Sequence, residues 1–274
     1  MELLKRVVSF FVSRDTIQPK SDEGAAPTDS RPDILVIENT SSSQYEKKRR
    51  FPRFSVEGKG VRSKMIFSER AELRNVSIGG ACFITSVALR PHKRVLIKIG
   101  SERIDEPLKG MSIWTNRNKT VQDSGGERSS YSIGIEFRDV TSNALIQLKD
   151  FMRASGVPEE KSLGDHQPSP LRYAIIRNEK AVINYPETCR VKKLSLCGML
   201  METDRELPVE QKYPMALFLP KEDEPIKFHG RIASLIPLTD KKRLLYDTGV
   251  EFLDLTESDR SRLEGFITTL SKKS

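Results

Sequence analysis

The sequence predicts a mainly β protein built from two small antiparallel barrels or sandwiches, each ending in one helix. Three observations support this fold class: apolar residues alternate within short segments, glycine-rich turns separate these segments, and the whole pattern occurs twice. The length of 274 residues fits two domains. Because 37% of the residues are hydrophobic, each half can bury a core.

An internal repeat sets the predicted domain organisation. The segment Asn75-Val-Ser-Ile-Gly-Gly has a counterpart in Lys193-Leu-Ser-Leu-Cys-Gly, and Gly134-Ile-Glu-Phe has one in Gly249-Val-Glu-Phe. Both copies keep the same order with nearly the same spacing, which indicates a tandem duplication. We therefore predict a short N-terminal helix and disordered linker over residues 1–44, a first β domain over 45–154, a linker over 155–169 and a second β domain over 170–274.

The first 44 residues differ from the rest in composition. Residues 1–14 have the apolar spacing of one short helix, which would dock on a partner, a membrane surface or the protein itself. The composition of residues 15–44 is typical of a linker. The apolar run Val7–Val12 is much shorter than the ~20 residues that span a bilayer, and no cleavage site follows it. We therefore expect a cytoplasmic protein, and three cysteines without CxxC spacing fit a reducing compartment.

The positive charge belongs to the predicted folded part. The chain carries 46 basic and 38 acidic residues. Residues 1–44 contain 5 basic and 7 acidic side chains, so the remainder has a net charge of +10. This charge, together with a small barrel, supports nucleic-acid binding as an alternative function. Trp114 is the only tryptophan, which leaves few platforms for base stacking.

The sequence contains no pattern of a known catalytic or metal centre. It lacks a nucleophile elbow, a zinc-protease helix, a P-loop and a dinucleotide fingerprint. The histidines His92, His166 and His229 are scattered without ligand spacing. We therefore predict no catalytic residue, no metal site, no cofactor and no enzymatic activity.

A basic segment opens the first predicted domain. Lys47-Lys-Arg-Arg-Phe-Pro-Arg53 carries five positive charges in seven residues. Pro52 restricts the residue before it to extended conformations, so Arg49 and Arg53 are expected on a loop. Guanidinium groups there are able to fork onto phosphate oxygens or onto the edge of guanine.

A second polar motif follows 22 residues later. The two-residue period of a strand puts Asn75 and Ser77 on one face, with two hydrogen-bonding side chains pointing the same way. Gly79 and Gly80 then allow the backbone to turn or to approach a ligand closely.

Together, Arg49-x-x-x-Arg53 and Asn75-x-Ser77-x-x-Gly80 resemble the RxxxR and [D/N]xSxxG signatures of the PilZ domain family, over about residues 46–154. The resemblance implies a six-stranded β-barrel and the second messenger cyclic di-GMP as a regulatory ligand. It implies that Arg49 and Arg53 clamp guanine edges and phosphates, and that Asn75 and Ser77 contact base and phosphate. Gly80 would leave room for the nucleotide.

The second copy resembles a degenerate PilZ domain. Lys193 replaces the Asn or Asp of the signature, although Ser195 and Gly198 are kept. Near its start, Arg172 and Arg177 are five residues apart instead of four. We expect this copy to serve as a scaffold, a dimerisation surface or a partner contact.

The expected function is that of a bacterial cyclic di-GMP receptor that controls motility, adhesion, biofilm or exopolysaccharide through an effector protein. The sequence leaves the oligomeric state open, with a homodimer as one possibility. The alternatives are a nucleic-acid-binding regulator and a PilZ adaptor that works without ligand.

Overall fold

The computed structural model describes residues 51–100, 104–118, 121–123, 126–158, 171–238 and 244–272. The predicted N-terminal helix, the linker over residues 15–44 and Arg49 lie outside the described residues. The chain divides into two compact units. Of the described residues, unit 1 contains 51–63 and 188–272, and unit 2 contains those between Lys64 and Glu187.

The two units exchange segments between the two sequence copies. Strand β2 (Arg62–Ser77) passes from unit 1 to unit 2 after Ser63, and strand β11 (Lys180–Leu194) passes from unit 2 to unit 1 after Glu187. The start of the first copy therefore folds with the second, and the start of the second folds with the first. The compact units thus differ from the predicted boundaries at residues 154 and 170.

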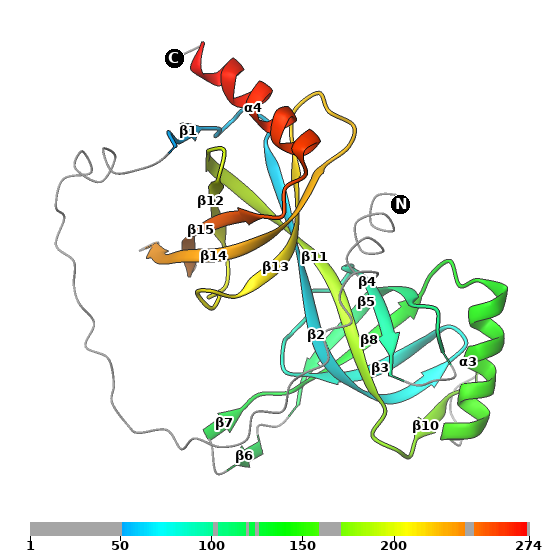
Figure 1. The fold of residues 1–274 in the computed structure, drawn as a ribbon. Coiled ribbons are helices and arrows are strands. Elements are labelled where there is room, and N and C mark those ends of the chain that lie inside the picture. The colour runs from blue at the N-terminus through cyan, green and yellow to red at the C-terminus, as the bar shows by residue number, and fades with distance from the viewer. Residues whose placement is uncertain are drawn as a thin grey trace, which may run out of the picture. The chain divides into compact units, whose positions relative to one another are not determined.

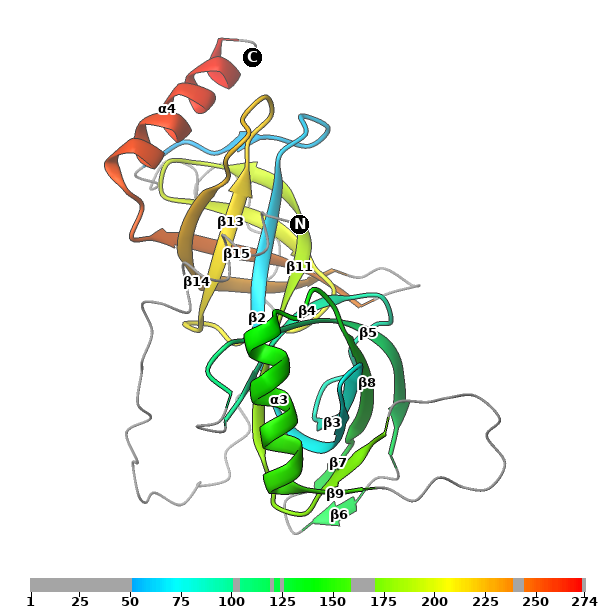
Figure 2. The same cartoon turned by 90° about the vertical axis from the view of Figure 1, so that its right-hand side faces the viewer.

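Unit 2 is a ring of antiparallel strands in the order β11, β4, β5, β8, β3 and β2. Because β2 also pairs with β11, the order returns to its starting point, and Figure 2 shows these strands curving around a common centre. The elements that unit 2 adds are β3 (Gly80–Thr85), β4 (Arg94–Ile99), β5 (Leu108–Arg117), β6 (Val121–Asp123), β7 (Gly126–Arg128), β8 (Tyr131–Phe137), α3 (Ser142–Ser155), β9 (Gly156–Pro158) and β10 (Tyr173–Ile175).

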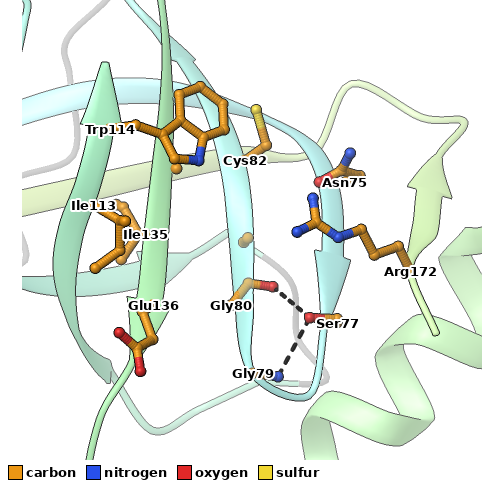
Figure 3. Close-up of a pocket in the computed structure, with 12 residues that line it drawn as sticks. Asn75, Ser77, Gly79, Gly80, Cys82, Ile113, Trp114, Ile135, Glu136 and Arg172 are labelled. Atoms are coloured by element: carbon orange, nitrogen blue, oxygen red, sulfur yellow. Dashed lines mark hydrogen bonds between the residues drawn. The ribbon is translucent and has the colours of Figure 1, made fainter. Parts of the chain in front are cut away.

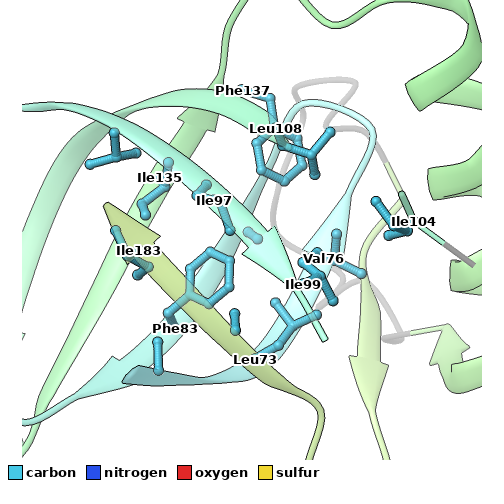
Figure 4. Close-up of a cluster of buried hydrophobic side chains, with 14 of the residues drawn as sticks. Leu73, Val76, Phe83, Ile97, Ile99, Ile104, Leu108, Ile135, Phe137 and Ile183 are labelled. Carbon is cyan, nitrogen blue, oxygen red and sulfur yellow. The ribbon is translucent and has the colours of Figure 1, made fainter. Parts of the chain in front are cut away.

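The core of unit 2 contains side chains from both sequence copies. Alternate residues of β11, Ala181, Ile183 and Tyr185, are buried in one cluster with residues of β2, β3 and β4. Ile183 pairs with Ile97 across the sheet. Figure 4 shows Ile183 beside Phe83 and Ile97 inside the ring. Since apolar burial is the main driving force of folding, unit 2 depends on a strand from the second copy.

Unit 1 repeats this arrangement, with strands in the order β11, β12, β15, β14, β13 and β2. The first copy contributes Val56 and Ser63, both buried, and the Ser63 hydroxyl donates to the carbonyl of Ala216 at 3.3 Å. Figure 1 shows α4 beside the strands of unit 1. The remaining elements of unit 1 are β1 (Phe54–Ser55), β12 (Gly198–Thr203), β13 (Lys212–Phe218), β14 (Ile226–Leu238), β15 (Leu245–Leu253) and α4 (Glu257–Ser271).

Among the described residues each unit contains one helix, and both helices begin with a threonine N-cap. The Thr141 hydroxyl accepts the amide of Ala144, and the Thr256 hydroxyl accepts that of Asp259, both at 3.1 Å. These bonds satisfy amides at the helix starts that have no partner within the helix. Neither helix combines the length and apolar composition that a membrane crossing requires, and the described residues contain no other that does. The mainly β prediction with two closing helices is confirmed.

Candidate ligand-binding pocket

A pocket with a volume of about 290 Å³ opens on unit 2 beside the turn between β2 and β3. It contains Asn75, Ser77 and Gly80, three of the five predicted site residues. Figure 3 shows its lining, which consists of Asn75, Ser77, Gly79, Gly80, Ala81, Cys82, Ile113, Trp114, Gly134, Ile135, Glu136 and Arg172.

A β-bulge directs Asn75 toward this pocket. The pairing of β2 with β3 shifts by one residue between Leu73 and Asn75. An extra residue in a strand reverses which following side chains face the core. As a result Leu73 and Val76 are both buried in the core, whereas Asn75 is half-buried and lines the pocket. Without the bulge, Asn75 would face the core on the same side of the strand as Leu73.

Ser77 forms the turn that follows β2. Its hydroxyl accepts the amide of Gly79 at 3.3 Å and donates to the carbonyl of Gly80 at 3.2 Å, as the dashed lines of Figure 3 show. The residue is only 5% exposed. The serine of the motif thus has a structural role in addition to its place in the pocket lining.

Gly80 is required by the packing of the strands. A Cβ atom at this position would collide with the carbonyl oxygen of Ile135 on the neighbouring strand β8. At Gly198 in unit 1, the same atom would collide with the carbonyl oxygen of Val250. The family resemblance implies that Gly80 leaves room for a nucleotide, and the backbone of β8 independently excludes a side chain there.

Trp114 lines the pocket but belongs to neither of the two sequence motifs. It lies opposite Gly134, and a Cβ on Gly134 would collide with the indole Nε1. A bulge between Ser112 and Trp114 turns the indole out of the core, and the residue is 37% exposed. An exposed indole face beside polar groups is suited to stacking on a planar base. The signal available in the sequence was that Trp114 is the one tryptophan of the chain.

Arg172 also lines the pocket, although the sequence assigned it to the second domain. It directly precedes β10, and β10 pairs with β2 so that Tyr173 lies opposite Val76 and Ala174 opposite Asn75. The predicted arginine Arg53 is exposed, belongs to unit 1 and is not among the residues that line this pocket.

The charge of the pocket comes from two side chains. Glu136 is its one acidic residue, and the guanidinium of Arg138 pairs with that carboxylate at 2.7 Å. Arg172 is the one basic residue among the twelve that form the lining. The described residues contain no group of three or more His, Cys, Asp or Glu side chains that could hold a metal ion. The pocket therefore combines an amide, an indole and a guanidinium, which suit an anionic ligand with planar rings.

The corresponding position of unit 1 has different chemistry. Lys193 takes the place of Asn75, and Ser234, opposite Gly249, takes the place of Trp114. Ser195 is buried and donates to the carbonyl of Gly198 at 3.0 Å, so the turn is kept. Glu251, the counterpart of Glu136, pairs with Arg231.

Arg231 in unit 1 is part of a charge cluster. Its guanidinium bonds to the carboxylates of Glu210 and Glu251. The hydrogen bonds that it donates to Glu210, and next those to Glu251, raise the pKa of Arg231 above its usual value. Two neighbouring carboxylates therefore balance the positive charge of Arg231. Arg172, the basic residue of the pocket in unit 2, has no such pair of acidic partners among the described residues.

The fold and the pocket define a protein of two six-stranded β units, one of which presents a polar pocket at the turn of a signature motif. A family model for the PilZ domain matches residues 47–154 and again residues 165–269. The chain therefore belongs to the PilZ domain family. Each match supplies segments to both compact units.

Several solved structures are similar to parts of the chain. A K. pneumonia MrkH complex with c-di-GMP has 12% identity and a TM-score of 0.30, covering 77% of this chain and 88% of MrkH. Escherichia coli YcgR with c-di-GMP has 12% identity and a TM-score of 0.27, covering 74% and 84%. Borreliella burgdorferi PlzA with c-di-GMP has 11% identity and a TM-score of 0.21, covering 82% and 97%. Among curated proteins, no relative matched the sequence.

Proposed function

We propose that this protein is a cyclic di-GMP receptor without catalytic activity, and that the nucleotide binds in the pocket of unit 2. The observation that carries the proposal is the meeting of the intact Asn75-x-Ser77-x-x-Gly80 motif with the exposed indole of Trp114 in one pocket. Membership of the PilZ family supports cyclic di-GMP as the ligand.

The chemistry of the lining fits a guanine nucleotide. The Asn75 amide offers a donor and an acceptor, which match the edge of a base. The indole of Trp114 offers an aromatic face on which a base stacks. The volume of about 290 Å³ is close to the lower end of the ~300–1,000 Å³ range of small-molecule pockets. The pocket therefore has room for part of the dinucleotide, with the remainder toward solvent.

Arg49 and Arg53 belong to this proposal as the arginines of the family motif. Arginine neutralises phosphate in a forked geometry, and cyclic di-GMP carries two phosphates. Arg53 is exposed, so its guanidinium is accessible to solvent ions and ligands. In this proposal Asn75 and Trp114 select the base. Arg53 belongs to unit 1, so the contribution of the two family arginines to phosphate binding is tested separately by the double variant below.

The proposed output is a conformational change that alters binding to an effector protein in the cytoplasm. This effector would act in the control of motility, adhesion, biofilm or exopolysaccharide. Neutralising basic residues near the ligand would order the segments that carry them. The partners proposed for this output are an effector protein, a second copy of the chain, or a membrane surface reached by residues 1–14.

Calorimetric titration of the full chain with cyclic di-GMP tests the proposal. Binding near micromolar Kd, about −8 kcal/mol, is expected for the native chain and is lost in the Arg49→Ala/Arg53→Ala double variant. Asn75→Ala should weaken it by about 1–3 kcal/mol. GTP serves as the control for binding of any guanine nucleotide. The absence of heat with the native chain at high micromolar nucleotide would overturn the proposal.

Nucleic-acid binding is the second candidate, supported by the net charge of +10 on residues 45–274. Such binding depends steeply on salt because counterions are released from the phosphate backbone. A mobility shift with DNA or RNA that weakens as salt rises, with and without cyclic di-GMP, would establish it.

A further inference from the structure

The pocket of unit 2 is lined by residues that lie far apart in the sequence. Asn75 and Ser77 come from the first sequence copy, and Arg172 comes from the start of the second. The pairing of β10 with β2 brings them together, because Ala174 lies opposite Asn75 and Tyr173 opposite Val76. This register puts position 172 opposite Ser77, on the face of the pocket.

In unit 1 an equivalent strand pairing places Arg53 where unit 2 has Arg172. There β1 pairs with β11, so that Phe54 lies opposite Leu194 and Ser55 opposite Lys193. Arg53 directly precedes β1 as Arg172 directly precedes β10. The two arginines are therefore structural counterparts, each placed beside the signature turn of the other sequence copy.

As a result, the arginine motif and the Asn75 motif of the first sequence copy lie in different units. The basic segment that ends at Arg53 leads into the strand beside Lys193 and Ser195, where the motif lacks its Asn or Asp. The complete Asn75-x-Ser77-x-x-Gly80 motif instead lies beside Arg172. Proximity in sequence thus pairs Arg53 with Asn75, whereas strand pairing associates Asn75 with Arg172.

Arg172 differs from the other lining residues of the pocket in its charge. It is the one cationic side chain in the lining, and the one acidic group, Glu136, pairs with Arg138. Among the described residues, no carboxylate forms an ion pair with Arg172. Figure 3 shows its side chain extending from the β10 segment toward Asn75 on β2. An exposed guanidinium at the edge of a neutral pocket is suited to phosphate.

From these observations we infer that Arg172 binds a phosphate of the ligand, so that both sequence copies build one nucleotide site. The identity of the ligand rests on the proposed function above. The second copy is then more than a degenerate duplicate, since it completes the site of the first. A bound ligand would then contact both the segment before β10 and the turn after β2.

Titration of cyclic di-GMP into the full chain, beside Arg172→Ala and Arg177→Ala, tests this inference. Arg177 is the matched control, because it is an exposed arginine of the same segment that does not line the pocket. Loss of a hydrogen bond to a charged group predicts that Arg172→Ala raises Kd about tenfold to hundredfold. Arg177→Ala, with the same change in net charge, should stay within about twofold of the native chain.

The outcomes separate this inference from the proposed function. Native binding with an unchanged Kd in Arg172→Ala would overturn the role of Arg172 and leave the receptor function standing. An equal loss in Arg172→Ala and Arg177→Ala would also overturn it, because net charge alone would then explain the effect. Absence of binding by the native chain would overturn both. Thermal unfolding of the ligand-free variants should match the native chain, since Arg172 is exposed.

Discussion

Trp114 lies directly opposite Gly134, and its indole occupies the space that a side chain on Gly134 would need. The glycine thereby lets the ring lie against β8 while one part of it faces the pocket. In the second copy Gly249 is kept, but Ser234 stands opposite it. The pair of a large ring and a glycine thus distinguishes the unit that we propose to bind nucleotide.

The first prediction uses this tryptophan as a reporter. Because Trp114 is the only tryptophan in the chain, cyclic di-GMP binding should change its fluorescence. The emission should saturate at the Kd found by calorimetry. Trp114→Phe should lose the signal but keep most of the affinity, whereas Trp114→Ala should weaken binding by about 1–3 kcal/mol through lost stacking. Calorimetric binding without any change in emission would locate the ligand elsewhere.

The second prediction compares Asn75 with Lys193, which occupy equivalent positions in the two copies. Asn75→Ala should weaken cyclic di-GMP binding by about 1–3 kcal/mol, because a side chain that pairs with a base edge is lost. Lys193→Ala should leave the Kd unchanged. If calorimetry instead finds the larger effect for Lys193→Ala, attraction by net charge governs binding and the pocket assignment fails.

The third prediction concerns the stability of the motif glycine. Gly80→Ala should lower the free energy of unfolding by about 1–3 kcal/mol even without ligand, because its Cβ would meet the backbone of β8. Gly265→Ala is the control: a Cβ there has open space, and the residue lies inside α4. Replacing a helical glycine should stabilise the protein by about 0.5–1 kcal/mol. Scanning calorimetry should therefore show melting temperatures that move in opposite directions.

The fourth prediction separates the two roles of Ser77. Its hydroxyl forms two hydrogen bonds within the turn, and Ser195 forms a similar bond to Gly198. Ser77→Ala and Ser195→Ala should each cost about 1 kcal/mol of stability, measured by chemical denaturation. Only Ser77→Ala should also weaken nucleotide binding. Equal affinities of the two variants would restrict the serine to its structural role.

Sequence patterns were sufficient for the fold class because they report local chemistry. The duplicated order of turns and alternating segments predicted two β units, and the apolar spacing near Leu148 and Leu263 predicted the closing helices, whose buried faces contain these residues. Short motifs also identified Asn75, Ser77 and Gly80 as neighbours, because they lie on one strand and its turn.

The sequence did not reveal why part of the polar motif is kept in both copies. Ser195 and Gly198 are kept in the second copy although Lys193 replaces the Asn or Asp. Hydrogen bonding in the turn and the contact with Val250 explain this retention without any ligand. Only the hydrogen bonds and the distances between strands reveal which motif residues serve the fold.

The sequence by itself determined the β-rich duplication, the family and the polar turn at residues 75–80. Tertiary structure decided which arginine accompanies that turn, because β10 pairs with β2 while β1 pairs with β11. It also decided that Asn75 leaves the core, through a bulge that strict alternation does not predict. Strand exchange and register depend on contacts between segments about a hundred residues apart, and the free energy of those contacts is invisible to local patterns.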